Sequence, residues 1–398
     1  MKPPKFNLKI TSVYRYLFKR DTIVATILVF LVIGLFVKID KELGVFDPKD
    51  ITSKDFDYND LAFNLLSKTK NLPVDTSICI VNIGNADRKA IAQIINKVSR
   101  AQAKVIGVDV LFGDSVSDGE DTALRSIFHR NKQVVMAYLL DSAANHIANY
   151  FDDTLCKKGF VNFTLQDQNV IREFNPYIIA ADTDFSFSTA IIKAADPDRY
   201  TDLMARGNKT EAINYTRAEN KFIVIDGASQ QGDFNIVKNK IVLIGKVASG
   251  TDYEDKHYTP LNSKFAGKSM PDLSGVLIQA NIIRMELDGN YIHRWRGWQN
   301  LLFAFVICWI HTAFFIAYFI EKHIWFHVAS KIAQLISSFV FIYLGLFLFY
   351  SFNQQINMTQ TIVAIILAVD ILYFYEAGVT WLHHKTGYKT LFHHEYPN

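Results

Sequence analysis

The chain has 398 residues, a formal net charge of +3 at pH 7, 50% hydrophobic residues and 20% charged residues. This composition is apolar-rich for a soluble protein, and so small a net charge gives no reason to expect a nucleic-acid partner. The three cysteines, Cys79, Cys156 and Cys308, are far apart, so no disulfide framework, metal cluster or cofactor is predicted.

The N-terminal end of the chain has the pattern of a membrane anchor. Residues 1–21 are predicted to be a basic cytoplasmic segment, because the first twenty residues contain Lys and Arg but no acid. Residues 22–37 carry no charge and are predicted to cross the membrane. Charged residues follow at 38–42, where a cleavable signal peptide would have small ones, so we expect an uncleaved anchor.

Residues 38–296 have the composition of a globular domain and alternate between two patterns. Short apolar runs typical of buried strands occur at 78–81, 105–112, 133–137, 222–225 and 241–244. Segments with helical periodicity lie between them, at 88–101, 121–130, 186–195 and 274–287.

Strands that are apolar on both faces and alternate with helices are typical of a parallel sheet covered by helices. The expected fold is therefore an α/β extracytoplasmic domain with a mainly parallel sheet, together with four transmembrane α-helices. Residues 141–184 are more polar and are interpreted as an insertion or an extension of the sheet. Residues 196–220 are interpreted as a helix followed by a loop.

Three apolar runs follow the globular region, and each is long enough to cross a membrane. The predicted spans are 299–320, 332–352 and 360–382, and residues 383–398 are predicted to be a cytoplasmic tail. Short loops rich in lysine are expected in the cytoplasm, which puts both termini inside and the domain outside. We expect a multi-pass protein of the bacterial inner membrane with its large domain in the periplasm.

A loop with acidic and imidazole groups follows the apolar run at 241–244. Asp252, Glu254, Asp255 and His257 lie just past the carboxyl end of this strand, where open α/β sheets usually bind ligands. Such groups can bind a divalent cation. The alternative is structural: Asp255 and His257 hydrogen-bond to the backbone and hold the turn into Thr259–Pro260. We favour the structural alternative and predict no metal.

Three further polar residues are candidate ligand-binding groups. Asp109 ends an otherwise apolar strand, and because a buried carboxylate is costly unless paired, we expect it to have a specific partner. Asn162 and Arg172 lie near the polar insertion and are candidates for an anionic ligand, although we favour a salt bridge between Arg172 and Asp167.

The predicted spans contain polar residues, which are costly in a membrane and indicate function or helix contacts. Asp370 and Glu376 lie in the last span, and their spacing puts them on different faces of the helix. His311 in the second span is a candidate partner of Asp370. The two interpretations are a proton or ion pathway and helix–helix adhesion, of which we favour adhesion.

The central region also resembles a known family on motifs spread along its length. The matching stretches are 78–83, 103–112, 121–124, 159–162, 167–172, 185–190, 240–245, 255–260 and 275–280. In this order, and between one span and three, they resemble the second CHASE family, an extracellular sensory domain associated with cyclases and histidine kinases. Asn169 replaces an expected glycine. Family members typically continue into an output domain, which this chain lacks, so no enzymatic activity is expected.

These observations together favour a membrane sensor that is not an enzyme. Its partners would be the lipid bilayer and a separate protein in the membrane or cytoplasm, with a homo-oligomer as a further option. One alternative is a structural or assembly subunit of an envelope complex. The other, less favoured, is an ion-translocating subunit that uses Asp370 and Glu376.

Overall fold

The computed structural model describes residues 10–43, 59–63, 72–147, 149–151, 156–164, 170–180, 182–229, 234–248, 255–262, 270–321 and 326–392. The chain divides into two compact units. Residues 52–292 form one, which we call the α/β domain, and residues 1–51 and 293–398 form the other, which we call the helical unit. Each has its own hydrophobic core.

The α/β domain is organised around one sheet, whose strand order is β10-β1-β11-β2-β3-β4, with β5 also paired to β3. β4 pairs antiparallel to β3, and the other described pairs in this sheet are parallel. This confirms the predicted mainly parallel sheet. The strands are β1 (Ile78–Asn82), β2 (Val105–Asp109), β3 (Val134–Leu140), β4 (His146–Ile147), β5 (Lys157–Phe160), β10 (Ile223–Asp226) and β11 (Ile241–Gly245).

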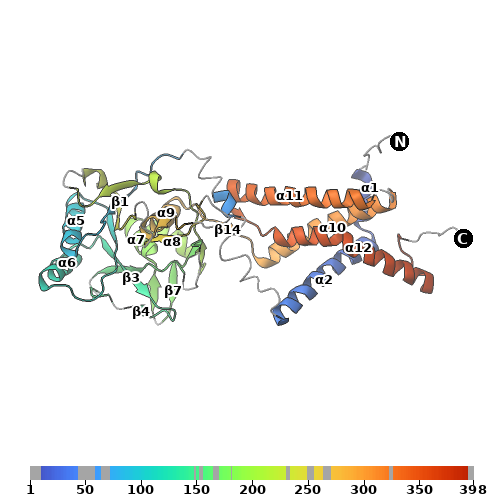
Figure 1. Cartoon of the computed structure of the whole chain (residues 1–398), viewed down its shortest axis with the longest axis horizontal. Coiled ribbons are helices and arrows are strands. Elements are labelled where there is room, and N and C mark those ends of the chain that lie inside the picture. Colours follow the sequence, from blue (N-terminus) through green and yellow to red (C-terminus); the bar gives the residue numbers. More distant parts are fainter. Residues whose placement is uncertain are drawn as a thin grey trace. The chain divides into compact units, whose positions relative to one another are not determined.

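Helices cover both faces of the sheet, which explains why the central strands are apolar on both sides. Alternate strand residues such as Val81, Ile106 and Val242 share a core with α5 (Arg88–Arg100) and α6 (Asp118–Arg130). Figure 1 shows α5 and α6 together on one side of the sheet, with α7 (Phe187–Ala195) and α9 (Gly275–Asp288) on the other.

Capping side chains determine where the helices begin. Asp87 accepts a hydrogen bond from the amide of Ala90 at the start of α5, and Ser186 does the same for Thr189 at the start of α7. Ser117 caps α6, which therefore starts at Asp118, before the predicted start. Asp196 caps α8 (Pro197–Ala205), the helix expected within residues 196–220.

The polar region 141–184 extends the sheet, as predicted. It supplies β5, which runs parallel to β3, and a hairpin of β7 (Tyr177–Ile179) and β8 (Thr183–Phe185). A separate pair joins β6 (Glu173–Phe174) to β9 (Glu211–Ala212). The short helices η1 (Glu219–Lys221) and η2 (Phe234–Val237) precede β10 and β11.

The helical unit contains the apolar helices predicted from the sequence. Among the described residues, four are long and apolar enough to cross a membrane: α2 (Arg20–Leu43), α10 (Gly297–Glu321), α11 (Phe326–Phe352) and α12 (Thr359–Thr386). This identifies a multi-pass membrane protein. α11 begins earlier than its predicted span, so that Lys331 lies inside a helix rather than in a loop.

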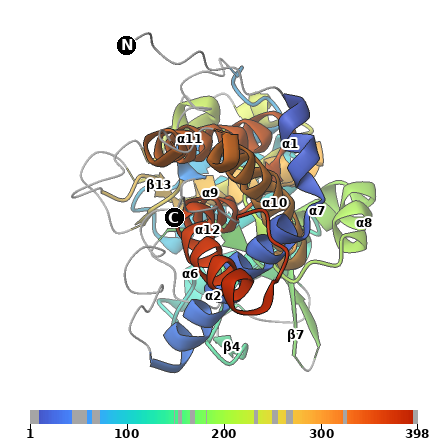
Figure 2. The same ribbon diagram turned by 90° about the vertical axis from the view of Figure 1, so that its right-hand side faces the viewer.

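The helical unit is packed unevenly. Residues of α2, α10 and α12 share a core that includes Ala25, Phe315 and Ala368, whereas only 17% of the α11 span is buried, compared with 44% for α10 and α12. A short helix that was not predicted, α1 (Ile10–Leu17), lies beside α10 (Figure 2). There the indole of Trp309 donates a hydrogen bond to the carbonyl of Leu17 at 2.8 Å.

Close packing of α7 on β5 gives a first prediction. A Cβ atom on Gly159 would lie 2.6 Å from Cα of Phe187, which is backbone and cannot rotate away. Gly159→Ala should therefore lower the free energy of unfolding by about 1–3 kcal/mol, measured by thermal unfolding of the intact protein in detergent.

Gly119→Ala is the matched control for this prediction. Gly119 is exposed in the first turn of α6, and nothing lies within 4 Å of the added atom. Alanine there should be neutral or slightly stabilising. Equal unfolding temperatures for the two variants would show that the backbone contact at Gly159 does not constrain the fold.

Candidate functional site at the carboxyl edge of the sheet

Three strand ends meet at the carboxyl edge of the sheet. Since β11 lies between β1 and β2, the register places Gly245 beside Asn82 on one side and Asp109 on the other. A Cβ atom on Gly245 would lie 3.0 Å from Cγ2 of Val276 and 3.3 Å from Cβ of Asp109. The glycine thus allows the first turn of α9 to approach this edge closely.

Asp109 stands at this edge without the partner expected from the sequence. It is half-buried, and within the described residues its carboxyl group has no hydrogen bond or ion pair. Loss of hydration raises the pKa of Asp109 to about 7, and the negative charge of Asp255 raises it as well. The energetic cost of burial is therefore reduced by protonation rather than by pairing.

The loop after β11 is attached to the start of α9 at the same place. The carboxylate of Asp255 lies 3.2 Å from Nζ of Lys246, and its backbone carbonyl accepts a hydrogen bond from the amide of Gly275 at 3.2 Å. The hydroxyl of Ser274 accepts one from the amide of Ala248. We call Asp109, Lys246 and Asp255 the carboxyl-edge site; Lys246 was missed in the sequence.

A metal site at this edge stays a hypothesis. Asp252 lies outside the described residues, and so does Glu254. Over the part of the chain that the structure describes, no group of three His, Cys, Asp or Glu side chains could hold a metal ion.

The turn into Thr259–Pro260 is held by a carboxylate that the sequence analysis did not identify. Asp272 accepts hydrogen bonds from the amide of Thr259 at 2.8 Å and from its hydroxyl at 2.6 Å. Burial raises the pKa of Asp272 to about 6, although the two hydrogen bonds from Thr259 act in the opposite direction and lower it. Among the described residues, Asp255 and His257 make no side-chain hydrogen bond to this turn, but their backbone carbonyls accept hydrogen bonds from the amides of Gly275 and Asp272.

His257 has a different position. It lies in β12 (Lys256–His257), which pairs antiparallel with β13 (Leu273–Ser274), and its ring contacts that of Phe163 edge-on at 5.6 Å. Within the part of the chain that the structure describes, no hydrogen bond or ion pair joins it to Asp109.

The other two predicted ligand residues make structural contacts. The side-chain amide of Asn162 exchanges two hydrogen bonds with the backbone of Leu140, at 2.8 and 3.0 Å, and so continues the pairing of β3 and β5. Arg172 forms a two-pronged ion pair with the buried Asp60, at 3.1 and 2.7 Å. The favoured partner Asp167 lies outside the described residues.

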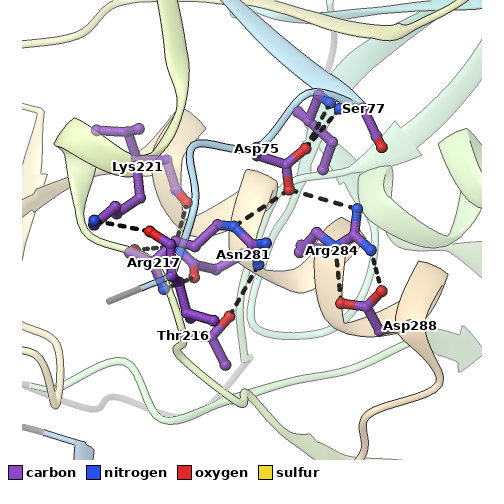
Figure 3. Close-up of polar contacts among 11 residues, drawn as sticks. Asp75, Ser77, Thr216, Arg217, Lys221, Asn281, Arg284 and Asp288 are labelled. Atoms are coloured by element: carbon purple, nitrogen blue, oxygen red, sulfur yellow. Dashed lines mark hydrogen bonds and ion pairs between the residues drawn. The ribbon is translucent and has the colours of Figure 1, made fainter. Parts of the chain in front are cut away.

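A polar network secures α9 near its other end (Figure 3). One oxygen of Asp75 accepts hydrogen bonds from the amides of Ser77 and Ile78 at the start of β1. The other lies 3.3 Å from Nε of Arg217 and 3.5 Å from Nη1 of Arg284, which belongs to α9. α9 is therefore tied to the sheet at both ends.

In the helical unit, polar side chains join α11 to its neighbours. His311 on α10 lies 3.0 Å from the hydroxyl of Ser337, and Asp370 on α12 forms an ion pair with Lys331 at 3.0 Å. The expected pairing of His311 with Asp370 is therefore wrong, because each side chain meets a closer group on α11. Glu376 is half-buried on α12, with no hydrogen bond among the described residues.

The start of α2 is bound to residues that follow α12. The buried carboxylate of Asp21 accepts hydrogen bonds from the hydroxyl of Tyr375 at 2.7 Å and from the amide of Leu391 at 2.9 Å. Phe392 is buried against Phe319 and Tyr375. Within the predicted tail, residues 387–392, which we call the tail segment, therefore pack on the helical unit.

These features define a class of protein: a multi-pass membrane protein whose α/β domain lies in the chain between one apolar helix and three. A family model described as the CHASE2 domain matches residues 38–314, from within α2 to within α10. The chain belongs to the CHASE2 family of sensory domains, which confirms the resemblance found in the sequence. Comparison with curated proteins gives no match, and comparison with solved structures gives none either.

The raised pKa of Asp109 predicts a pH-dependent stability. Between about pH 4 and pH 7 the folded protein holds a proton that the unfolded chain has released, so stability falls as pH rises, by up to about 1.4 kcal/mol per pH unit. Asp109→Asn removes this loss of stability with rising pH, because asparagine does not titrate. The unfolding temperature of the variant relative to wild type should rise from pH 5 to pH 8.

Asp226→Asn, at the exposed end of β10, removes a carboxylate from the same edge of the sheet and serves as the control. If both variants change the pH profile equally, the effect does not belong to Asp109.

The ion pair between α11 and α12 predicts an energetic coupling. In a double-mutant cycle with Lys331→Met and Asp370→Leu, the double variant should lose less stability than the sum of the single variants, by about 1 kcal/mol. Thermal unfolding of the purified protein gives the comparison. His311→Leu combined with Asp370→Leu should be additive, since these side chains bond to different groups. Additivity in the first cycle would contradict the pairing.

Proposed function

We propose that this protein is a membrane sensor without enzymatic activity, in the inner membrane of a bacterium. In this proposal the α/β domain lies in the periplasm, where it binds a ligand or an envelope protein. The helices pass the resulting change to a separate cytoplasmic partner. The basic N-terminal residues, Lys385 in the last turn of α12 and Lys389 after it support cytoplasmic termini.

The observation that carries this proposal is the position of α9 between the carboxyl-edge site and the membrane helices in the chain. Its first residues touch the site: the amide of Gly275 bonds to Asp255, and Val276 lies against Gly245. Its last residue is Asp288, and residues 289–296, which include the short strand β14 (His293–Arg294), connect it to α10. In this proposal a displacement of α9 acts through this connection on the start of a membrane-spanning helix.

The carboxyl-edge site can respond to a ligand through its charges. An anionic ligand group that takes Lys246 from Asp255 would break the ion pair that holds Asp255, the residue whose backbone carbonyl is bonded to Gly275 at the start of α9. A ligand that stabilises one protonation state of Asp109 would change the charge at the same edge of the sheet. Ligand binding changes an equilibrium only if the ligand prefers one arrangement of the domain over the other.

The tail segment and the start of α2 form a surface suited to the output. Asp21 joins α2, α12 and the tail segment through its two carboxylate oxygens. Because α10 packs against both α2 and α12, a shift of α10 would alter how the tail segment is held. The proposed partner binds there.

Hydrogen exchange of the full-length protein in lipid nanodiscs tests the coupling. Asp109→Asn fixes the carboxyl-edge site in a neutral form. We expect it to change amide exchange in α9, and in the tail segment as well, by at least about threefold, a change of about 0.7 kcal/mol in opening free energy.

Asp226 lies at the same edge but on the outermost strand β10. Asp226→Asn should therefore leave amide exchange in α9 and in the tail segment unchanged. The proposal fails if Asp109→Asn alters exchange within the α/β domain alone and leaves the tail segment as in wild type.

A further inference from the structure

The amino edge of the sheet carries a row of lysines that the proposed sensing mechanism does not use. Lys240, Lys104 and Lys132 precede β11, β2 and β3, which are adjacent in the sheet. The pairs Ile241↔Val105 and Ile106↔Val134 put the three lysines at matching positions in the register. Neighbouring strands lie about 4.8 Å apart, so the backbone positions that carry these lysines are spaced at about this interval.

Two adjoining hollows follow this row. One has a volume of about 460 Å³, and its cationic lining is Lys104, Lys238, Lys240 and Arg284, of which Arg284 is already ion-paired with Asp75 and Asp288. The other has a volume of about 590 Å³, and its cationic lining is Lys104, Arg130, Lys132 and Lys157. Lys104 lines both, and no Asp or Glu is among the described residues that line either one. We call this surface the amino-edge groove.

Stabilisation of the fold explains only part of the positive charge of the amino-edge groove. The helices α5 and α6 end near this edge, and cations in the last turn of a helix, such as Arg130, are stabilised by its dipole. Lys104, Lys132 and Lys157 lie outside the helices, are exposed, and form no ion pair among the described residues. Like charges at neighbouring strand positions repel each other, so this row lowers stability unless an anion neutralises it.

The chemistry of the row indicates the kind of anion. A lysine ammonium is a compact point charge on a flexible stem, which suits phosphate oxygens and does not require the planar geometry that arginine recognises. Positive charges repeated along a line suit a ligand with several negative charges in sequence better than a single small anion.

We propose that the amino-edge groove binds several neighbouring phosphate groups at once. It lies at the opposite end of the strands from the carboxyl-edge site, so the inference is independent of the proposed sensing site. The phosphates can belong to a soluble polyphosphate chain or to the headgroups of an anionic lipid surface, because both present the same charged oxygens.

Binding of defined probes to the full-length protein in nanodiscs of zwitterionic lipid tests this proposal. The soluble probe is inorganic polyphosphate, and the membrane probe is a vesicle containing phosphatidylglycerol. Lys104→Gln/Lys132→Gln should weaken binding about tenfold or more and lower the slope of log affinity against log salt concentration by about two. Binding of polyphosphate alone assigns a soluble ligand, and binding of vesicles alone assigns a lipid surface.

Lys89→Gln/Lys209→Gln is the control, since it removes two exposed lysines from elsewhere on the domain and should leave the affinity unchanged. The proposal is overturned if neither probe binds at physiological salt, or if both double variants weaken binding equally. It is also overturned if polyglutamate binds more tightly than polyphosphate. Matching unfolding temperatures establish that the variants are folded.

Discussion

The packing of α9 against β1 and β11 is the constraint on which the rest of the α/β domain depends. Most of this helix is buried, so its polar side chains need partners inside the protein. Asn281 bonds to the backbone of Arg217, and Arg284 reaches Asp75 at the start of β1. α9 is therefore held to the rest of the domain at both ends, and in the proposed mechanism it is this helix that carries a change at the carboxyl edge toward α10.

The parallel sheet gives its two edges different chemistry. At the carboxyl edge, Asp109 has no cationic partner among the described residues, and its pKa is raised to about 7, which makes the charge at this edge sensitive to pH near neutrality. At the amino edge, the same strand order lines up Lys240, Lys104 and Lys132. One arrangement of strands thus produces a titratable site at one end and a fixed cationic surface at the other.

The strands and helices could be predicted because their signals are local: apolar residues on both faces of β11, and a capping Ser186 before α7. The partners of the polar side chains could not be predicted, since they are remote in the sequence. Arg172 pairs with Asp60, Asp272 holds Thr259, and Lys331 rather than His311 meets Asp370. The lysine row could not be predicted either, because it is recognisable only once the strand order β11-β2-β3 is known.

The central claim is that the state of Asp109 reaches the membrane helices through α9. Spin labels at the exposed positions Leu302 on α10 and Phe339 on α11, with the native cysteines replaced by alanine, report the distance between these helices by pulsed electron paramagnetic resonance. The account predicts that the distance distribution shifts between pH 6 and pH 8, and that Asp109→Asn removes the shift. An identical wild-type distribution at both pH values would contradict it.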